Sequence, residues 1–401
     1  MIIREKYLNL LIEAKDTEFI KVITGVRRSG KSTLLLMYKD YLLQNNVSEK
    51  NIIHINFESA MYDEIRDYKD LYNKIKSQIS NKKTYILLDE VQNVEKWEKA
   101  INSLNVDFDV DIYITGSNAY LLSSELATLL SGRYIEIKMY PLSFKEFMKF
   151  NNYDKENIED KFNEYLKYGG LPAISQIKDK SNLVMSYLND IYNTIVKKDI
   201  IERNNIKDIA LLENIVRYIA ANIGSSISAN KISDYLNSNK IVDKANHQTI
   251  DNYLKMLENA FIVYKADRSD IRSKALLKTL GKYYISDTGI RNILLGFRNI
   301  EEGHLLENVV YLELLRRGYK VNIGKTLDYE VDFVAESPDE IKYYQVTKSL
   351  MSDEVKNREI RSLESICDNY EKMILTMDRS INKDYNGIKV KNIIDFLLEE
   401  E

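Results

Sequence analysis

The chain has 401 residues, of which 44% are hydrophobic and 29% charged, and its formal net charge is −4. This composition is that of a globular protein large enough for two or three domains, and the negative balance excludes a protein that coats nucleic acid through its overall charge. A single cysteine, Cys367, excludes an intrachain disulfide framework and fits a reducing compartment. Because no run of about 18 apolar residues occurs, we expect no membrane span and a cytoplasmic location.

Residues 1–140 are predicted to form an α/β domain. Short apolar segments rich in β-branched residues alternate with helical stretches, which is typical of a buried parallel sheet. Ligands of such sheets bind at the carboxyl ends of the strands. The expected strands span residues 19–24, 51–57, 84–89, 111–115 and 134–137.

The segment after the first strand reads Gly-Val-Arg-Arg-Ser-Gly-Lys-Ser and matches the phosphate-binding pattern G-x-x-x-x-G-K-[ST]. Its glycines let backbone N–H groups turn toward phosphates, and the following helix favours an anion at its N-terminus. Lys31 supplies charge to the β- and γ-phosphates, and Ser32 supplies a ligand for Mg²⁺. Arg27 and Arg28 would contact phosphate or another subunit, or would be solvated. The predicted ATP-binding residues of this segment are Gly25, Arg27, Arg28, Ser29, Gly30, Lys31, Ser32 and Thr33.

A second nucleotide motif ends the strand at 84–89, where Asp89 is followed by Glu90. Asp89 is predicted to hold Mg²⁺ together with Ser32, and Glu90 to polarise the attacking water. Acids also cap strand ends without any function, but these two follow a phosphate-binding loop with one strand, 51–57, between. That extra strand and the adjacent Glu are typical of the additional-strand class of P-loop enzymes.

Three further residues of this domain are candidates for contact with the nucleotide. Ser117 and Asn118 follow the strand at 111–115 and would reach the γ-phosphate or the attacking water; the alternative is an ordinary helix cap. Arg133 precedes the last strand and would stabilise transition-state charge as a catalytic residue, either in its own chain or in a neighbouring subunit. Its alternative is a surface or structural arginine.

The middle of the chain is predicted to be a helical lid or linker, 141–207, followed by a winged helix-turn-helix domain, 208–300. Its helices and wing strands are expected at 210–222, 229–236, 247–259, 261–264 and 283–285. The third helix of such a domain enters the major groove of duplex DNA.

A local basic balance supports DNA contact in this middle region. Between residues 265 and 282 there are six Lys or Arg and two Asp, in a chain that is acidic overall, and this would suit phosphate contact. The alternative is an interdomain packing module with a solvated charged face. The predicted DNA-contacting residues are His247, Gln248, Asn252, Lys255, Arg268, Arg272 and Lys274.

Several motifs of the chain resemble one protein family. They are Gly25–Ser32, Leu87–Gln92, Ile114–Asn118, Tyr168–Pro172, Glu330–Val334 and Gln345–Thr347. The sequence resembles, over nearly its whole length, the prokaryotic AAA-type ATPases of the archaeal-ATPase kind. The resemblance implies an α/β multidomain fold with an AAA+ core, a winged-helix middle and a C-terminal α+β domain similar to restriction endonucleases. It does not fix a biological role, because most relatives are known only as predicted ATPases.

Residues 301–401 would form that C-terminal domain, and some of their side chains resemble a nuclease metal site. Glu307 lies on the first expected helix and Asp332 on the second expected strand. The tripeptide that normally reads Glu-x-Lys begins here with Gln345 and ends with Thr, which do not supply the charges that the metal and the water need. Glu330 shares the strand face of Asp332 and would be a substitute ligand. A degenerate domain kept for binding or packing is favoured over active cleavage.

The leading functional hypothesis is a Mg²⁺-dependent AAA+ ATPase that couples its nucleotide state to duplex DNA through the winged helix. One alternative is a slow nucleotide-dependent switch for protein partners, with the winged helix purely structural. Another is an ATP-dependent nuclease. The sequence leaves open whether the chain forms a homo-oligomer.

Overall fold

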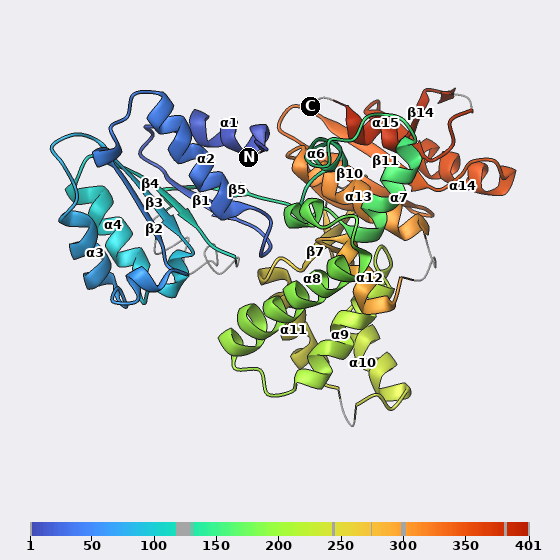
Figure 1. The fold of residues 1–401 in the computed structure, drawn as a ribbon. Helices are drawn as coiled ribbons and strands as arrows, with labels where there is room; N and C mark the ends of the chain where they lie inside the picture. The colour runs from blue at the N-terminus through green and yellow to red at the C-terminus, as the bar shows by residue number, and fades with distance from the viewer. Residues whose placement is uncertain are drawn as a thin grey trace. The chain divides into compact units, whose positions relative to one another are not determined.

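The computed structural model divides into two compact units, residues 1–140 with 259–261, and residues 141–258 with 262–401. Each unit has its own β-sheet (Figure 1). Within the described part of the chain, no helix combines the length and the apolar character needed to cross a membrane. The structure describes residues 2–117, 130, 132–242, 245–273, 275–297, 302–380 and 383–399.

The sheet of the first unit has the order β2-β3-β4-β1-β5, and its neighbouring strands are all parallel. The predicted strands and the parallel α/β core are therefore confirmed. One detail differs from expectation: the strand inserted between β1 and β3 is β4, whereas the strand predicted at 51–57 is the edge strand β2. The strands are β1 Ile20–Thr24, β2 Ile52–Asn56, β3 Thr84–Asp89, β4 Val110–Thr115 and β5 Tyr134–Lys138.

Helices cover both faces of this sheet, α1 and α2 on one side and α3 and α4 on the other (Figure 1). The strands alternate accordingly: Ile23 packs in the core under α1 and α2, while Ile20 and Val22 pack in the core under α3 and α4. The elements are α1 Glu5–Glu13, α2 Lys31–Gln44, α3 Tyr68–Lys76, α4 Trp97–Asp107 and the 3₁₀ turns η1 Glu49–Asn51, η2 Ala60–Tyr62 and η3 Val91–Asn93.

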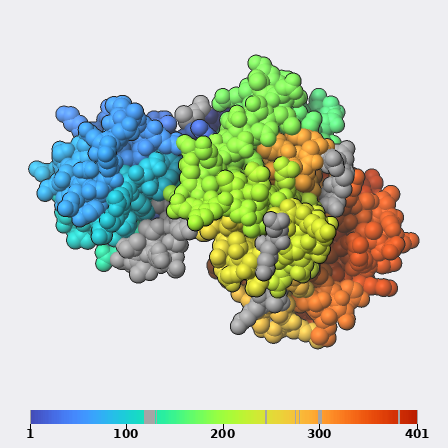
Figure 2. Space-filling view, turned by 90° about the horizontal axis from the view of Figure 1, so that it is seen from below, coloured from blue at the N-terminus to red at the C-terminus, as the bar shows by residue number. Residues whose placement is uncertain are grey.

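The second unit begins with helices. Those from α8 to α11 lie together on one face of this unit, in green to yellow in Figure 2. The third helix expected in the middle region, 247–259, has the same bounds as α11, and α8 continues as the π-helix η6. The elements are α6 Phe144–Phe150, α7 Ile158–Tyr168, η5 Pro172–Gln176, α8 Ser181–Thr194, η6 Ile195–Glu202, α9 Ile209–Ala221, α10 Ala229–Ser238, α11 His247–Asn259 and α12 Thr288–Leu295.

A buried aspartate explains the Tyr-Gly-Gly-Leu-Pro motif at 168–172. Asp287 caps α12 by accepting from the N–H groups of Gly289 and Ile290, and its other oxygen accepts from Gly170 N at 2.7 Å. Gly169 has φ 80°, and a Cβ there would lie 2.0 Å from Asp287 Oδ1. Burial raises the pKa of Asp287 to about 6. The glycines of the motif therefore allow a close approach of backbone to carboxylate.

The second unit also contains a nine-stranded sheet of order β13-β14-β12-β11-β10-β9-β7-β8-β6. The hairpin β7–β8, which includes the expected wing strand 283–285 and overlaps the one at 261–264 only from Val263, joins the C-terminal strands through parallel pairing of β7 with β9. Strands from both sides of residue 300, where a domain boundary was expected, therefore belong to the same sheet. The elements are β6 Ser226–Ile227, β7 Val263–Asp270, β8 Leu276–Ile285, α13 Glu302–Arg316, β9 Lys320–Lys325, β10 Glu330–Glu336, β11 Ile341–Thr347, α14 Asp353–Glu364, β12 Glu371–Thr376, β13 Asp384–Tyr385, β14 Ile388–Asn392 and α15 Ile393–Leu398.

Candidate functional site

The loop between β1 and α2 has the backbone that a phosphate cradle needs. Gly25 has φ 141°, and a Cβ at this position would lie only 2.0 Å from the carbonyl oxygen of Met139. Gly30 adopts a left-handed conformation, with φ 104°, directly before the first residue of α2. Both positions require glycine, and the loop ends at the N-terminus of a 14-residue helix, whose free N–H groups and dipole favour an anion.

Three polar side chains in and beside the loop, those of Ser29, Lys31 and Ser117, are buried. Lys31 is only 4% exposed, and its Nζ donates to the loop carbonyls of Gly25 at 3.0 Å and Val26 at 3.2 Å. The hydroxyl groups of Ser29 and Ser117 are buried and have no hydrogen-bond partner among the described residues. Buried polar groups without partners are uncommon in native proteins, so these two hydroxyls are available to hydrogen-bond a group bound at the loop.

Arg4, in the N-terminal segment, hydrogen-bonds to the loop and was not among the residues predicted from the sequence. Its Nη1 donates to the carbonyl oxygens of Ser29 at 3.0 Å and Tyr140 at 2.8 Å, and its guanidinium lies 4.5 Å from the ring centroid of Tyr7. Arg4 is 3% exposed. The sequence predicts that an arginine in the polar run Arg-Glu-Lys near the N-terminus is exposed at the surface. The hydrogen-bond partners of Arg4 are distant in the sequence, so only the fold shows that it is buried.

Thr115, at the end of β4, connects the two acidic residues of the second motif. Its Oγ1 donates to Asp89 Oδ1 at 2.5 Å and accepts from Glu90 N at 2.9 Å. Burial raises the pKa of Asp89, and hydrogen bonds from Thr115 and Ser32 oppose this. Oxygen atoms of Ser32 and Asp89 thus lie together beside the loop. Magnesium prefers such oxygen ligands, so this pair of residues fits the ion that the motif implies.

Glu90 is held in an unusual conformation. It has φ 55°, in the left-handed region that non-glycine residues seldom adopt, and it is 7% exposed. Its Oε2 accepts a hydrogen bond from Gln92 Nε2, and the amide oxygen of Gln92 is buried without a partner among the described residues. Strained backbone of this kind is concentrated at functional sites. Gln92, the last residue of the motif at 87–92, is therefore a further candidate residue of the site, to which the sequence assigned no role of its own.

The remaining predicted nucleotide residues occupy different positions. Arg27 forms an ion pair with Glu58 at 3.1 Å, Arg28 is exposed with φ 66°, and Thr33 is half-buried in the first turn of α2. Asn118 lies outside the described residues. In this structure, Arg27 is therefore paired with an acid and Arg28 is exposed to solvent.

Arg133 lies at the amino ends of the strands, whereas the loop lies at their carboxyl ends. Its carbonyl oxygen accepts from Ile20 N, at the amino end of β1, whereas the loop follows the carboxyl end of β1. Five strand residues separate the two ends, about 16 Å. The exposed Arg133 is therefore not placed to reach the nucleotide of its own chain.

Five of the seven predicted DNA-contacting residues are exposed. His247, Gln248, Asn252 and Lys255 are exposed on α11, and Arg272 is exposed beside the β7–β8 turn. Lys274 lies outside the described residues.

Two cations of the predicted basic wing are not on an exposed face. Arg268 is largely buried, and its Nη2 lies 3.4 Å from Glu330 Oε2. Lys282 is 5% exposed and is surrounded by carboxylates. The exposed surface of residues 265–282 is therefore less positive than their sequence suggests, because two of the six cations are largely buried and paired with acids.

The residues of the doubtful nuclease site do converge, but on a lysine. Lys282 Nζ lies 3.0 Å from Glu307 Oε1, 3.3 Å from Glu330 Oε1 and 3.5 Å from Asp332 Oδ1. Gln345 Oε1 accepts from Asp332 N at 2.6 Å. In the described part of the chain, no cluster of His, Cys, Asp or Glu has an arrangement able to hold a metal ion. Lys282 is one of the six Lys or Arg residues between 265 and 282 whose positive balance predicted phosphate contact.

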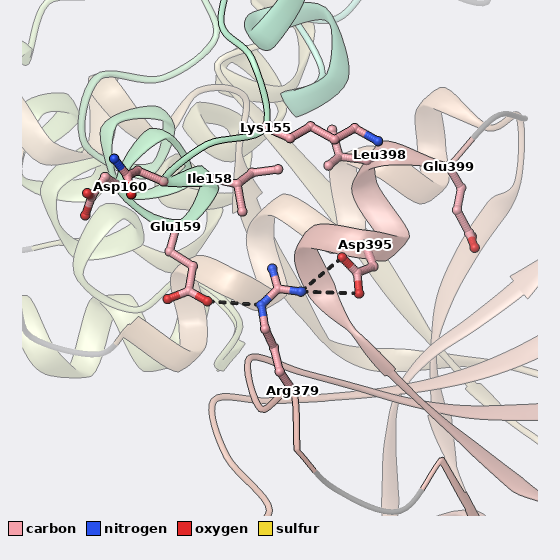
Figure 3. A pocket seen from close by; sticks show the side chains of 9 residues that line it. Lys155, Ile158, Glu159, Asp160, Arg379, Asp395, Leu398 and Glu399 are labelled. Carbon is pink, nitrogen blue, oxygen red and sulfur yellow. Dashed lines mark hydrogen bonds and ion pairs between the residues drawn. The ribbon is translucent and has the colours of Figure 1, made fainter.

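Two cavities of the second unit are unrelated to the phosphate-binding loop. Their volumes are about 780 and 560 Å³. In the larger one, Arg379 Nε lies 3.0 Å from Glu159 Oε1, and Arg379 Nη1 lies 3.2 Å from Asp395 Oδ1 (Figure 3). This arginine is neutralised on both sides by residues of α7 and α15. The arrangement is that of a structural ion-pair network.

The comparisons with known proteins agree with the geometry of the loop. Residues 17–148 match the family described as an AAA domain, and residues 159–301 match a domain of unknown function. An uncharacterized protein of Haemophilus influenzae is 45% identical over 403 aligned residues, which cover 100% of this chain and 99% of that protein. An uncharacterized protein of Methanocaldococcus jannaschii is 35% identical, with coverage of 90% and 82% respectively.

Among solved structures, the Walker-type ATPase PABY2304 of Pyrococcus abyssi superposes with a TM-score of 0.52 at 16% identity, covering 74% of this chain and 96% of that one. At this identity the likeness concerns the fold alone. The loop, the acidic strand end and the parallel sheet are those of a P-loop ATPase core. The chain belongs to the same family as the Haemophilus and Methanocaldococcus proteins, and residues 17–148 match the AAA domain.

Proposed function

We propose that this chain is a Mg²⁺-dependent ATP hydrolase whose nucleotide state controls the binding of duplex DNA. The observation that carries the hydrolytic part is the Thr115 hydroxyl, which joins Asp89 and Glu90 beside the phosphate-binding loop. This arrangement holds a metal-binding acid and a proton-accepting acid at fixed positions next to one phosphate site. Catalysis of phosphoryl transfer depends mainly on such positioning and on charge stabilisation.

Each residue of the site has a role in this proposal. The loop N–H groups and Lys31 bind the β- and γ-phosphates, with the hydroxyls of Ser29 and Ser117 as additional donors. Ser32 and Asp89 would hold Mg²⁺, which would supply positive charge that neutralises the phosphates. Glu90 accepts a proton from the water that attacks the γ-phosphorus, while the bond from that phosphorus to the β,γ-bridging oxygen breaks and ADP leaves.

The DNA-binding part of the proposal rests on the helices α9 to α11 and the hairpin β7–β8. Three helices followed by a two-stranded hairpin form the order of a winged helix, and α11 would be the recognition helix. Its exposed face carries Gln248, Asn252 and Lys255, which suit contacts with base edges and phosphates. Arg272 beside the β7–β8 turn would add a phosphate contact.

A second candidate is a nucleotide-dependent switch that binds a protein partner. It is favoured by the placement of Arg268 and Lys282, whose charges are paired with carboxylates and so are withdrawn from the predicted wing. In addition, Lys255 on α11 is paired with Asp251 at 2.9 Å. A weakly basic surface would suit a protein partner better than a duplex.

Hydrolysis of ATP measured with and without duplex DNA, at low and moderate salt, separates these candidates. Under the DNA proposal, DNA stimulates hydrolysis in the wild type, and a Gln248→Ala/Asn252→Ala/Lys255→Ala variant loses the stimulation but keeps the basal rate. Lys389→Ala, a change at an exposed lysine of β14, is the matched surface control. Basal hydrolysis that is indifferent to DNA in the wild type would reject DNA coupling and favour the protein-partner switch.

A further inference from the structure

Lys282 is enclosed by acidic residues from two different elements of the second unit. Glu307 comes from α13, and Glu330 and Asp332 come from β10. One oxygen of each carboxylate faces Lys282 Nζ, at 3.0, 3.3 and 3.5 Å. The lysine side chain is only 6% exposed. An ammonium group has three N–H donors, so it can serve one donor to each of three acids.

The carboxylates are themselves fixed by other contacts. Glu307 Oε1 accepts from Tyr284 Oη at 2.5 Å, and Asp332 Oδ2 accepts from Val346 N at 2.9 Å. Glu330 Oε2 lies 3.4 Å from the guanidinium of Arg268. The three acids therefore cannot readily turn away from one another, and the cation between them offsets their mutual repulsion.

The backbone closes the cluster on the side of Glu307. Gly224 has φ 70°, and a Cβ on it would lie 2.8 Å from His304 Nδ1 and 3.0 Å from Glu307 Oε2. His304 Nδ1 lies 3.7 Å from the same carboxylate oxygen. Space beside Glu307 is therefore already taken by backbone and by the imidazole, and the position between the acids is taken by Lys282.

We propose that Lys282 is the built-in cation of this carboxylate cluster and takes the place of a divalent metal ion. The C-terminal part of the chain then does not cleave nucleic acid by a metal-dependent route, because the position that a metal would need is filled by an ammonium group. The same ion pairs connect β8, which carries Lys282, to α13 and β10. Lys282 therefore stabilises the packing of the hairpin β7–β8 against the C-terminal strands. This inference is independent of the proposed ATP hydrolysis.

The proposal predicts that removing the ammonium group creates a metal site. Lys282→Met keeps most of the side-chain volume and leaves three carboxylates facing one another, an oxygen-rich set of the kind that Mn²⁺ and Mg²⁺ bind. Binding of Mn²⁺ without nucleotide is measured by the loss of the free-ion EPR signal. The expected result is one additional Mn²⁺ per chain in Lys282→Met relative to wild type, which disappears in Lys282→Met/Asp332→Asn.

A matched control is Lys265→Met, which removes an exposed lysine from the neighbouring strand β7; it should bind no additional Mn²⁺. Melting temperatures provide a second readout, because an ion that binds only the folded state stabilises it. Millimolar Mn²⁺ should raise the melting temperature of Lys282→Met and leave that of the wild type and of Lys265→Met unchanged.

Two results would overturn the proposal. One is a folded Lys282→Met protein that binds no more Mn²⁺ than the wild type. The other is a wild-type protein that already binds Mn²⁺ in a manner abolished by Asp332→Asn, since the cluster would then be an open metal site. If Lys282→Met does not fold alone, it is refolded with and without millimolar MnCl₂; recovery only with Mn²⁺ supports the proposal, and no recovery with the ion counts against it.

Discussion

At the scale of single residues, the first unit contains a buried ion pair inside its sheet. Lys21 Nζ on β1 lies 2.5 Å from Asp111 Oδ1 on β4, and both side chains are fully buried. The other oxygen of Asp111 accepts from Tyr113 Oη at 3.0 Å and from Asp16 N at 2.8 Å. Burial lowers the pKa of Lys21, and the charge of Asp111 opposes this. Each charge therefore depends on its partner.

Replacing Asp111 by Asn should destabilise the first unit strongly. The change leaves the Lys21 ammonium buried without a countercharge, which costs about 3–5 kcal/mol. The one tryptophan of the sequence, Trp97, is buried in this unit, so urea unfolding followed by its fluorescence measures the effect directly. The control is Asp109→Asn, at an exposed residue two positions away, for which a change within about 0.5 kcal/mol is expected. A loss below about 1 kcal/mol in Asp111→Asn would contradict the account.

Gln92 offers a second prediction at this scale, which rests on the proposed hydrolysis. Because Gln92 donates to the carboxylate of Glu90, we expect it to position that group. Gln92→Ala should lower kcat by about 10- to 100-fold and leave the affinity for ATP unchanged. Asn93→Ala, at the exposed neighbouring residue, should change neither quantity. Equal losses of kcat and of nucleotide affinity in Gln92→Ala would indicate a structural role instead.

At the scale of elements, the sequence predicted strands and helices well where local patterns determine them. The apolar β-branched runs marked the five strands of the first sheet, and the helical periodicity of 247–259 gave the bounds of α11. The short helix α15 and the strand β13 were not foreseen, since six and two residues carry too little periodicity.

The candidate site was only partly predictable for a different reason. Gly25, Lys31 and Asp89 belong to motifs of fixed spacing, which the sequence shows directly. Arg4 and Lys282 act through partners 25 to 136 residues away. Nothing in the local sequence separates a buried, paired cation from a solvated one, so Arg4 was not noticed and Lys282 was assigned to a basic surface.

The packing of β10 against α13 and β8 leads to a pH prediction. Burial, and then the negative charge of Glu307, raise the pKa of Asp332 to about 7, although Lys282 and the N–H of Val346 oppose the shift. As the pH rises from about 4 toward 7, the unfolded chain loses this proton before the folded chain does, so the contribution of Asp332 to stability decreases.

The prediction is measured as the difference in melting temperature between Asp332→Asn and wild type. Between pH 5 and pH 8, the melting temperature of Asp332→Asn should rise relative to that of the wild type. The wild type loses the contribution of Asp332 to stability over this range, whereas Asn does not titrate. Asp339→Asn, in the exposed turn between β10 and β11, provides the reference and should show no such trend. A difference for Asp332→Asn that is independent of pH would contradict the raised pKa.

At the scale of the whole molecule, the position of Arg133 bears on assembly. This exposed residue lies at the amino ends of β1 and β5, away from the phosphate-binding loop of its own chain. We propose that, if Arg133 stabilises transition-state charge, it does so in a second copy of the chain. Arg133→Ala should then lower hydrolysis by about 10³-fold, with nucleotide binding preserved.

Mixing experiments test this arrangement. Arg133→Ala supplies an intact Glu90, and Glu90→Gln supplies an intact Arg133, so a mixture of the two inactive proteins should regain activity at mixed interfaces. Activity should also rise with protein concentration in the wild type. A mixture as inactive as its components, or an Arg133→Ala protein with the wild-type rate, would exclude the role in trans.

The central claim is that the loop at 25–32, together with Asp89 and Glu90, binds and hydrolyses ATP. The most direct measurement is Mg²⁺-dependent phosphate release from ATP, with nucleotide binding measured on the same preparations of wild type, Lys31→Ala and Glu90→Gln. The account predicts turnover by the wild type, loss of both binding and turnover in Lys31→Ala, and binding without turnover in Glu90→Gln. Turnover that survives in either variant, or a folded wild-type protein that binds no ATP, would contradict it.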